Sequence, residues 1–376
     1  MSPGPSTTRS IPEAGERLPG RGSAIAFTVA AVAIGLLLTV VQVRALGSAS
    51  GLLSVGPHAP GYPLVHDEIP HLRTAVGRGH DGVYFYAIAR HPFAFSRTAR
   101  ILVVPTFRYR RILFPLLAGR LAPGGGLGLV YAMVLVSLAG VALGAWSLAR
   151  LPGAPRWLSL MAILNPGVIA ALFYSLSDAL ATGLVLAAFA TMSRRRVAAT
   201  VAWLVLAAFT RETAVLAALA LACWPGLRTR DRVAVAGLPV ASLAAWSAYV
   251  AARTHSSSFA QPNGGALTWP LGGWIHGGGT SGNLMIELAL VGVLLLALVR
   301  WRGWPAPVPL FVLANLVLLV CASTAVTSWW YDATRVASAA FPLAVWMIVG
   351  SPDAFATAGG GRLAAPTGAP RDPVAP

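Results

Sequence analysis

Long apolar runs separated by short polar segments dominate the hydropathy pattern of this chain. Several runs approach the roughly 20 residues that an α-helix needs to cross a bilayer. The first run is too long for a signal peptide, and no small-residue cleavage site follows it. The pattern therefore predicts an all-α, polytopic integral membrane helix bundle of about ten spans. The predicted spans are residues 24–46, 126–148, 157–174, 178–192, 197–209, 214–224, 233–252, 283–299, 306–326 and 333–350.

Polar segments separate one predicted transmembrane domain, residues 24–350, from two predicted tails. Residues 1–23 and 351–376 are rich in Pro and Gly, which favours disordered cytoplasmic tails. Residues 47–124 form a long first outer loop with short helical patterns, and residues 253–282 form a second outer loop. The pattern contains no repeat and no second soluble domain.

One part of the predicted topology has two interpretations. The runs on either side of Arg211 and Glu212 would each be about 20 Å long as helices, which is shorter than the hydrocarbon core of about 30 Å. A hairpin keeps both charges at the outer surface. A single helix over residues 197–224 would instead bury them near mid-membrane. We favour the hairpin.

Composition and charge support membrane insertion. The 376 residues are 56% hydrophobic and only 11% charged, whereas soluble domains average about 25% charged residues. The net charge is +16, and all 28 basic residues are Arg. So basic a chain could bind nucleic acid, but these arginines flank apolar runs, as the positive-inside rule requires. The rule places both termini in the cytoplasm. Because it accounts for the arginines, we expect no nucleic-acid partner.

With this topology, acids from several separate segments reach the outer side. Ionisable groups in or near a bilayer are costly, and most are functional or paired. We therefore predict that distant segments share one extracytoplasmic site. The outer acids are Asp67, Glu68, Asp81, Asp178, Glu212 and Asp332.

The stretch around Asp81 carries the strongest candidate chemistry. Asp81 follows His80, and Tyr84 and Phe85 lie on the same face of the helix predicted after it. A carboxylate in this position could act as a general base. It could equally cap the start of that helix, as acids commonly do.

Two other groups in the first outer loop could bind ligands. His66, Asp67 and Glu68 could hold a divalent cation such as Mg²⁺ or Mn²⁺, or form a solvated turn. The arginines of the second group could hold a phosphate through charge-assisted hydrogen bonds, or attract anionic lipid head groups. They are Arg108, Arg110 and Arg111.

Three further charged groups have both structural and functional interpretations. Ser177 and Asp178 start a predicted helix, which favours an N-cap role over a substrate contact. Arg211 and Glu212 could neutralise each other at the hairpin tip or bind substrate. Asp332 could likewise pair locally with Arg335, because residues three apart are neighbours on a helix, or these two side chains could contact substrate.

Several motifs between residues 60 and 225, listed below in chain order, together resemble the GT-C superfamily of multi-span glycosyltransferases. The likeness is to bacterial membrane mannosyltransferase-like proteins and to the second mannosyltransferase of GPI-anchor synthesis. The chain departs from that pattern in having Gly-His-Asp in place of Trp-Asp and Arg-Glu-Thr in place of Arg-Pro-Thr. The motifs are Gly79-His80-Asp81-Gly82-Val83-Tyr84-Phe85-Tyr86-Ala87-Ile88-Ala89, Arg111-Ile112-Leu113-Phe114-Pro115-Leu116, Asn165-Pro166, Tyr174-Ser175 and Thr210-Arg211-Glu212-Thr213.

The resemblance implies a membrane glycosyltransferase of the bacterial plasma membrane with its active site outside. It implies a polyprenyl-phosphate sugar donor, carrying a hexose or pentose with mannose favoured, and a glycolipid, glycan or protein acceptor in the cell envelope. Asp81 would be the general base beside His80, and arginines or a metal ion would stabilise the leaving phosphate. Two other classes stay open: a transporter or flippase for a lipid-linked or small anionic substrate, and a non-enzymatic membrane assembly protein.

Overall fold

The computed structural model describes residues 21–77, 79–257, 265–276 and 281–352, and every element within these ranges is a helix. The predicted all-α class is therefore confirmed. Only isolated β-bridges join extended segments in these ranges, for example between Val55 and Thr74. Most of the two predicted tails lies outside the described residues.

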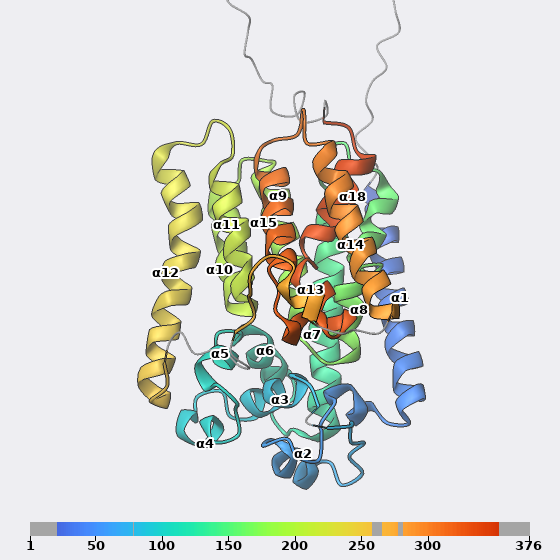
Figure 1. Cartoon of the computed structure of the whole chain (residues 1–376), viewed down its shortest axis with the longest axis vertical. Helices are drawn as coiled ribbons and strands as arrows, with labels where there is room; N and C mark the ends of the chain where they lie inside the picture. The colour runs from blue at the N-terminus through green and yellow to red at the C-terminus, as the bar shows by residue number, and fades with distance from the viewer. Residues whose placement is uncertain (1–20, 78, 258–264, 277–280, 353–376) are drawn as a thin grey trace, which may run out of the picture.

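The predicted first outer loop folds into a layer of short helices. Figure 1 shows these helices together at the lower end of the molecule. The aromatic helix α3 is the centre of this layer, because residues 82–89 are all buried. The layer consists of η1 (Ala49–Leu53), α2 (Tyr62–Glu68), α3 (Gly82–Arg90), α4 (Phe95–Ala99), α5 (Pro105–Tyr109) and α6 (Leu113–Leu121).

Apolar helices above this layer form the bundle (Figure 1). Several match the predicted spans closely, and α7 and α9 match residue for residue. The bundle elements are α1 (Arg21–Leu46), α7 (Gly126–Leu148), η2 (Arg156–Ala162), α8 (Pro166–Phe173), α9 (Asp178–Met192), α10 (Val197–Thr210), η3 (Glu212–Ala214), α11 (Val215–Ala222), α12 (Thr229–Thr254), α13 (Gly272–His276), α14 (Ser281–Val299), α15 (Pro307–Val320), α16 (Thr324–Thr327), α17 (Trp330–Val336) and α18 (Ala340–Val349).

The length of each helix limits how many can cross a membrane. Three described helices are long and apolar enough, namely Gly22–Leu46, Gly126–Leu148 and Thr229–Thr254. The number rises to five if each of two bent helix pairs forms one span. Other predicted spans are apolar helices of only 10–17 residues, such as α9 and α10. The count of about ten spans therefore stays a prediction.

The predicted third span is broken near Pro166. Helices η2 and α8 meet there at an angle of 42°. Pro166 is the first residue of α8, where a missing N–H costs nothing because that donor has no partner within the helix. Asn165 caps this helix, since its Oδ1 accepts a hydrogen bond from the Gly167 amide at 3.1 Å.

The predicted tenth span over residues 333–350 is bent in the structure. Helices α17 and α18 are separated by a bend of 68°. Side chains from other helices bind the backbone and side chain of Ser338 at this break. Asn165 Nδ2 donates to the Ser338 carbonyl at 2.5 Å, and Thr182 Oγ1 donates to Ser338 Oγ at 3.2 Å. These bonds hold the chain in a non-helical path that the apolar pattern did not reveal.

The runs over residues 197–224 form the predicted hairpin. Arg195, which precedes α10, donates from Nη1 to the carbonyl of Pro225, which follows α11, at 2.8 Å. The two helices therefore begin and end at the same end of the bundle, and the turn at η3 lies at the other end. Arg194 Nη2 also donates to the Arg150 carbonyl at 3.3 Å, so several Arg-rich turns share that end.

Helices α7 and α9 approach so closely that only glycine fits between them. A Cβ added at Gly140 would lie 2.5 Å from Leu180 Cα, and one added at Gly183 would collide with the Gly140 carbonyl. Small residues allow helix backbones to pack closely where the surrounding lipid offers no hydrophobic driving force. The first turns of α9, where Asp178 lies, are therefore held against α7.

This contact predicts that Gly140→Ala lowers thermal stability. The added methyl group would force α7 and α9 apart, at a cost of about 1–3 kcal/mol for an overpacked core. Gly292→Ala is the matched control, because a Cβ at Gly292 meets nothing within 4 Å and alanine is the better helix former. Thermal unfolding of the purified protein in detergent measures both. Equal melting temperatures for the two variants would contradict the close packing.

Candidate functional site

The Asp81 carboxylate is surrounded by guanidinium groups. Asp81 Oδ1 forms an ion pair with Arg108, and Asp81 Oδ2 lies 3.7 Å from Arg111 Nη1 and 3.7 Å from Arg335 Nη2. Asp81 occupies the N-cap position of α3, but its side chain makes no capping hydrogen bond. The capping interpretation is therefore wrong, because the carboxylate points toward cations from other segments.

Glycines on both sides of the His80–Asp81 pair allow this placement. Gly79 has φ +78°, and a Cβ there would collide with the Ser54 carbonyl. A Cβ at Gly82 would lie 2.7 Å from the carbonyl oxygens of Leu53 and Tyr174. The segment is fixed further by the His80 amide, which donates to the Ser54 carbonyl at 2.8 Å. The Gly-His-Asp-Gly sequence thus lets the backbone pass between neighbouring segments.

Asp178, at the start of α9, is fully buried between two arginines. It forms an ion pair with Arg211, and its Oδ2 lies 2.8 Å from Arg335 Nε. The predicted N-cap role for Ser177 and Asp178 is wrong, because no side chain caps α9. Burying an ion pair is costly unless the charges compensate each other, and here two cations hold one carboxylate.

Glu212 pairs with Arg111, from the first loop. Arg111 Nη2 donates to Glu212 Oε1 at 2.6 Å, and Arg111 Nε donates to Glu212 Oε2 at 2.9 Å. This is the two-point geometry typical of arginine and carboxylate. The predicted self-neutralising pair of Arg211 with Glu212 is therefore wrong. Each side chain instead binds a partner from a distant segment.

Arg335 connects three carboxylates. Its Nη1 donates to Asp332 Oδ1 at 2.9 Å, which confirms the predicted local pair. The same guanidinium reaches Asp178 and Asp81. His80 Nε2 lies 3.7 Å from Asp332 Oδ2 on the other side of that carboxylate.

These contacts define one set of side chains, which we call the ionic cluster. Four guanidinium groups face four carboxylates, and one imidazole lies beside them. The members come from the short-helix layer, from the starts of α9 and η3, and from α17, so distant segments meet as predicted. They are Asp81, Asp178, Glu212, Asp332, Arg108, Arg111, Arg211, Arg335 and His80.

Aromatic rings border the ionic cluster. The His80 ring stacks on Tyr174 with centroids 4.9 Å apart, and Tyr331 contacts it edge-on at 5.0 Å. His80 Nδ1 is buried and has no hydrogen-bond partner among the described residues. The Arg108 guanidinium lies 4.5 Å above the ring centroid of Tyr84, which brings the predicted aromatic residue into the site.

The arginines control the ionisation of Asp81. Burial alone would raise the pKa of this carboxyl group, but Arg108 and Arg335 outweigh that effect, with smaller contributions from His80 and Arg111. The pKa of Asp81 is therefore held far below its usual range. With all these partners in place, Asp81 is a stable anion and a poor acceptor for a proton.

The candidate metal ligands lie apart from the cluster. His66 and Asp67 are exposed, and the His66 ring stacks on Tyr62 at 5.2 Å. Glu68 accepts hydrogen bonds from Tyr86 Oη at 2.5 Å and from Arg90 Nε at 2.8 Å. Within the described ranges, no group of three or more His, Cys, Asp or Glu side chains is arranged to hold a metal ion.

Arg110 is the remaining predicted phosphate ligand. It directly follows α5 and is half-buried, next to Arg111 in the sequence. The ion pairs that define the ionic cluster do not include it.

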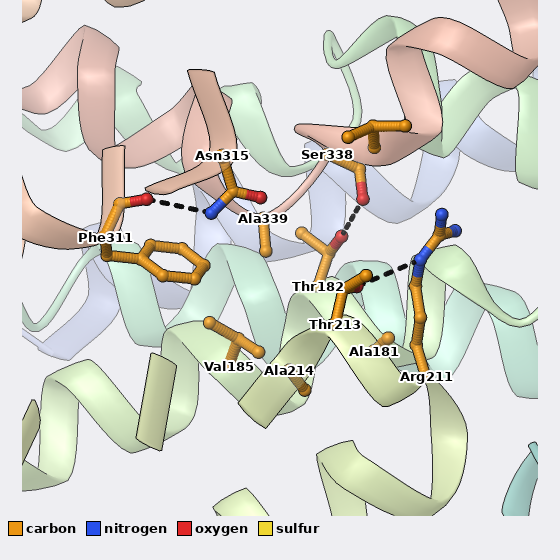
Figure 2. A pocket seen from close by; sticks show the side chains of 11 residues that line it. Ala181, Thr182, Val185, Arg211, Thr213, Ala214, Phe311, Asn315, Ser338 and Ala339 are labelled. Atoms are coloured by element: carbon orange, nitrogen blue, oxygen red, sulfur yellow. Dashed lines mark hydrogen bonds between the residues drawn. The ribbon is translucent and has the colours of Figure 1, made fainter. Parts of the chain in front are cut away.

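A small pocket beside Arg211 contains polar residues that the sequence analysis missed. Figure 2 shows Thr182, Asn315 and Ser338 around this pocket, together with the apolar side chains of Phe311 and Val185. It lies between α9, η3, α15 and the break between α17 and α18. The available signal was a polar residue inside an apolar run, as Asn315 is, because such residues are seldom without a role in membrane helices.

No protein-family model matches the chain, and comparisons with curated proteins and with solved structures give no match.

The burial of Asp178 predicts a large loss of stability in Asp178→Asn. This change would leave Arg211 and Arg335 without their shared buried anion, and breaking a buried pair in this way costs about 3–5 kcal/mol. Asp67→Asn removes the same charge from an exposed position and should change stability by less than about 0.5 kcal/mol. Thermal unfolding of both variants in detergent tests this difference. An Asp178→Asn protein as stable as the control would rule out a structural role for the buried pair.

Proposed function

We propose that the protein is a GT-C-like membrane glycosyltransferase. It would move a sugar from a polyprenyl-phosphate donor to an acceptor in the cell envelope. The observation that carries this proposal is the ionic cluster, in which Asp81, four arginines and His80 from distant segments meet at one end of an apolar helix bundle. The sugar is a hexose or pentose, with mannose favoured by the sequence resemblance.

The chemistry of this transfer fits the residues of the cluster. The acceptor oxygen attacks the anomeric carbon from the face opposite the phosphate and forms the new glycosidic bond. The bond between that carbon and the phosphate oxygen breaks, and the phosphate leaves with the electron pair. Asp81 takes the proton of the acceptor hydroxyl once it is released from its arginine partners, while the arginines stabilise the negative charge that grows on the phosphate. The anomeric configuration is inverted.

The direction of the bundle supports an extracytoplasmic active site. The Arg-rich turns at Arg150, Arg194 and Arg195 share one end of the bundle, and the hairpin turn with Arg211 lies at the other. By the positive-inside rule, the Arg-rich end faces the cytoplasm. The cluster would then face the outside of the bacterial plasma membrane, where a lipid-linked donor can diffuse to it.

One observation keeps a second function open. The pocket in Figure 2 extends from Arg211 to polar side chains within the bundle, Thr182 and Asn315. A transporter or flippase needs polar groups along a path through the membrane. Transport of a lipid-linked or small anionic substrate by reconstituted protein, without a glycosylated product, would favour this function.

The proposed reaction predicts that Asp81→Asn abolishes glycosyl transfer. Loss of a general base costs about 100-fold to 10,000-fold in rate. The measurement is mass analysis of envelope glycolipids and glycoproteins from cells without the gene, complemented with wild-type or variant protein. The expected result is a hexose or pentose that is lost without the gene and restored by the wild type alone.

Asp67→Asn provides the matched control, because it removes one carboxylate of the same layer at an exposed position. Protein abundance is measured in each strain. Full restoration by Asp81→Asn would reject Asp81 as the base. An envelope that is unchanged when the gene is removed would reject the glycosyltransferase proposal itself.

A further inference from the structure

Arg108 is the least occupied guanidinium of the ionic cluster. Arg111 is held by Glu212 at two points, and Arg335 contacts three carboxylates. Arg211 pairs with Asp178 and also donates from Nε to Thr213 Oγ1 at 3.2 Å. Arg108 pairs with Asp81 alone, through Nη1. Its side chain is only 9% exposed, and its buried Nε finds no hydrogen-bond partner among the described residues. A buried donor without a partner costs free energy, so this site is incomplete without a ligand.

The ligand that fits Arg108 is an organic phosphate. A guanidinium group donates hydrogen bonds in a planar fork, which matches two oxygens of a phosphate or carboxylate. Nε is one arm of that fork. The rings of Tyr84 and Phe107 lie 4.5 Å and 5.3 Å from the guanidinium carbon, so they hold the fork in place. A second acidic side chain would fit the fork as well, but no other carboxylate contacts Arg108 in the described part of the chain.

Charge balance decides what happens to Asp81 when an anion binds. Four guanidinium groups already face four carboxylates. A phosphate that binds through Nε of Arg108 adds a second anion beside Asp81 in this balanced set, so the two anions compete for one cation. Asp81 is the carboxylate that competes, because it is the one that pairs with Arg108 and because its other two cationic contacts are longer, at 3.7 Å.

Building on the proposed function, we infer that the phosphate of the donor binds Arg108 by displacing the Asp81 carboxylate, so that the donor itself releases the base. Before the donor binds, Arg108 holds Asp81 as an inactive anion. After the exchange, Asp81 has lost its closest cation and gained a negatively charged neighbour, and both changes favour proton uptake from an acceptor hydroxyl. No proton moves in the exchange itself.

This inference makes an unusual prediction about affinity. Asp81→Asn should tighten the binding of a phosphate to Arg108, because the competing carboxylate is gone, even though the same change abolishes transfer. Arg108→Gln should weaken binding. Each effect should be about tenfold or more, as expected for one charge-assisted hydrogen bond. In the Arg108→Gln background, Asp81→Asn should have no further effect, because both changes act on the same pair.

The experiment is titration calorimetry with the purified full chain in detergent and a short-chain isoprenyl phosphate as the probe. Inorganic phosphate and phosphatidylglycerol micelles are the parallel arms. Asp231→Asn is the matched control, because it removes one negative charge near the Arg-rich end of the bundle, where Asp231 lies beside Arg230. Its affinity for the probe should equal that of the wild type. Thermal unfolding confirms that each variant is folded.

The outcomes separate this inference from the proposed function. Tighter probe binding by Asp81→Asn when Arg108 is present, but not in the Arg108→Gln background, supports the exchange. This holds even if no glycosyl product is ever detected. Unchanged or weaker binding overturns it, even if the protein proves to be a glycosyltransferase. Tightening that persists in the Arg108→Gln background overturns it as well, because the effect is then general electrostatics. If phosphatidylglycerol alone shows the predicted pattern, the occupant of Arg108 is a phospholipid and the role of the donor is overturned.

Discussion

The need to neutralise a buried charge determines how this protein is assembled. Asp178 is completely buried at the start of α9 and contacts Arg211 from the hairpin turn and Arg335 from α17. An isolated carboxylate in such a place would cost several kcal/mol, so three segments far apart in the sequence must meet at one point. Arg335 then extends the network to Asp81 and Asp332, which joins the short-helix layer to the bundle.

Interruptions in the helices supply the charges for this network. Arg211 lies in the turn between α10 and η3, and Arg335 lies just before the bend between α17 and α18. Asn165 and Thr182 hold that bend by binding Ser338, and the close packing of α7 on α9 fixes where Asp178 stands. The apolar helices are therefore short where the polar site needs backbone turns.

The resulting site is balanced in charge and closed. Every carboxylate in the ionic cluster has at least one guanidinium partner, and the pKa of Asp81 is far below its usual range because of Arg108 and Arg335. Such a site holds Asp81 as an anion and is not ready for base catalysis. In the exchange that we propose, a phosphate that competes for Arg108 changes this balance and so links recognition of the donor to activation of the base. Nε of Arg108 and Nδ1 of His80 have no hydrogen-bond partner among the described residues, and in our proposal the substrate provides one.

The sequence by itself determined the all-α class, the bounds of helices such as α7 and α9, and most of the acids and arginines that meet, although the predicted Asp67 and Glu68 lie outside the ionic cluster. Periodicity and hydropathy predict these features because they depend on local patterns. Only the tertiary structure decided which charge pairs with which. Arg211 binds Asp178 rather than its neighbour Glu212, and Asp81 binds arginines rather than capping its helix. Local rules cover residues three or four apart, whereas these ion pairs join segments separated by tens to more than a hundred residues, whose proximity depends on how the whole bundle packs.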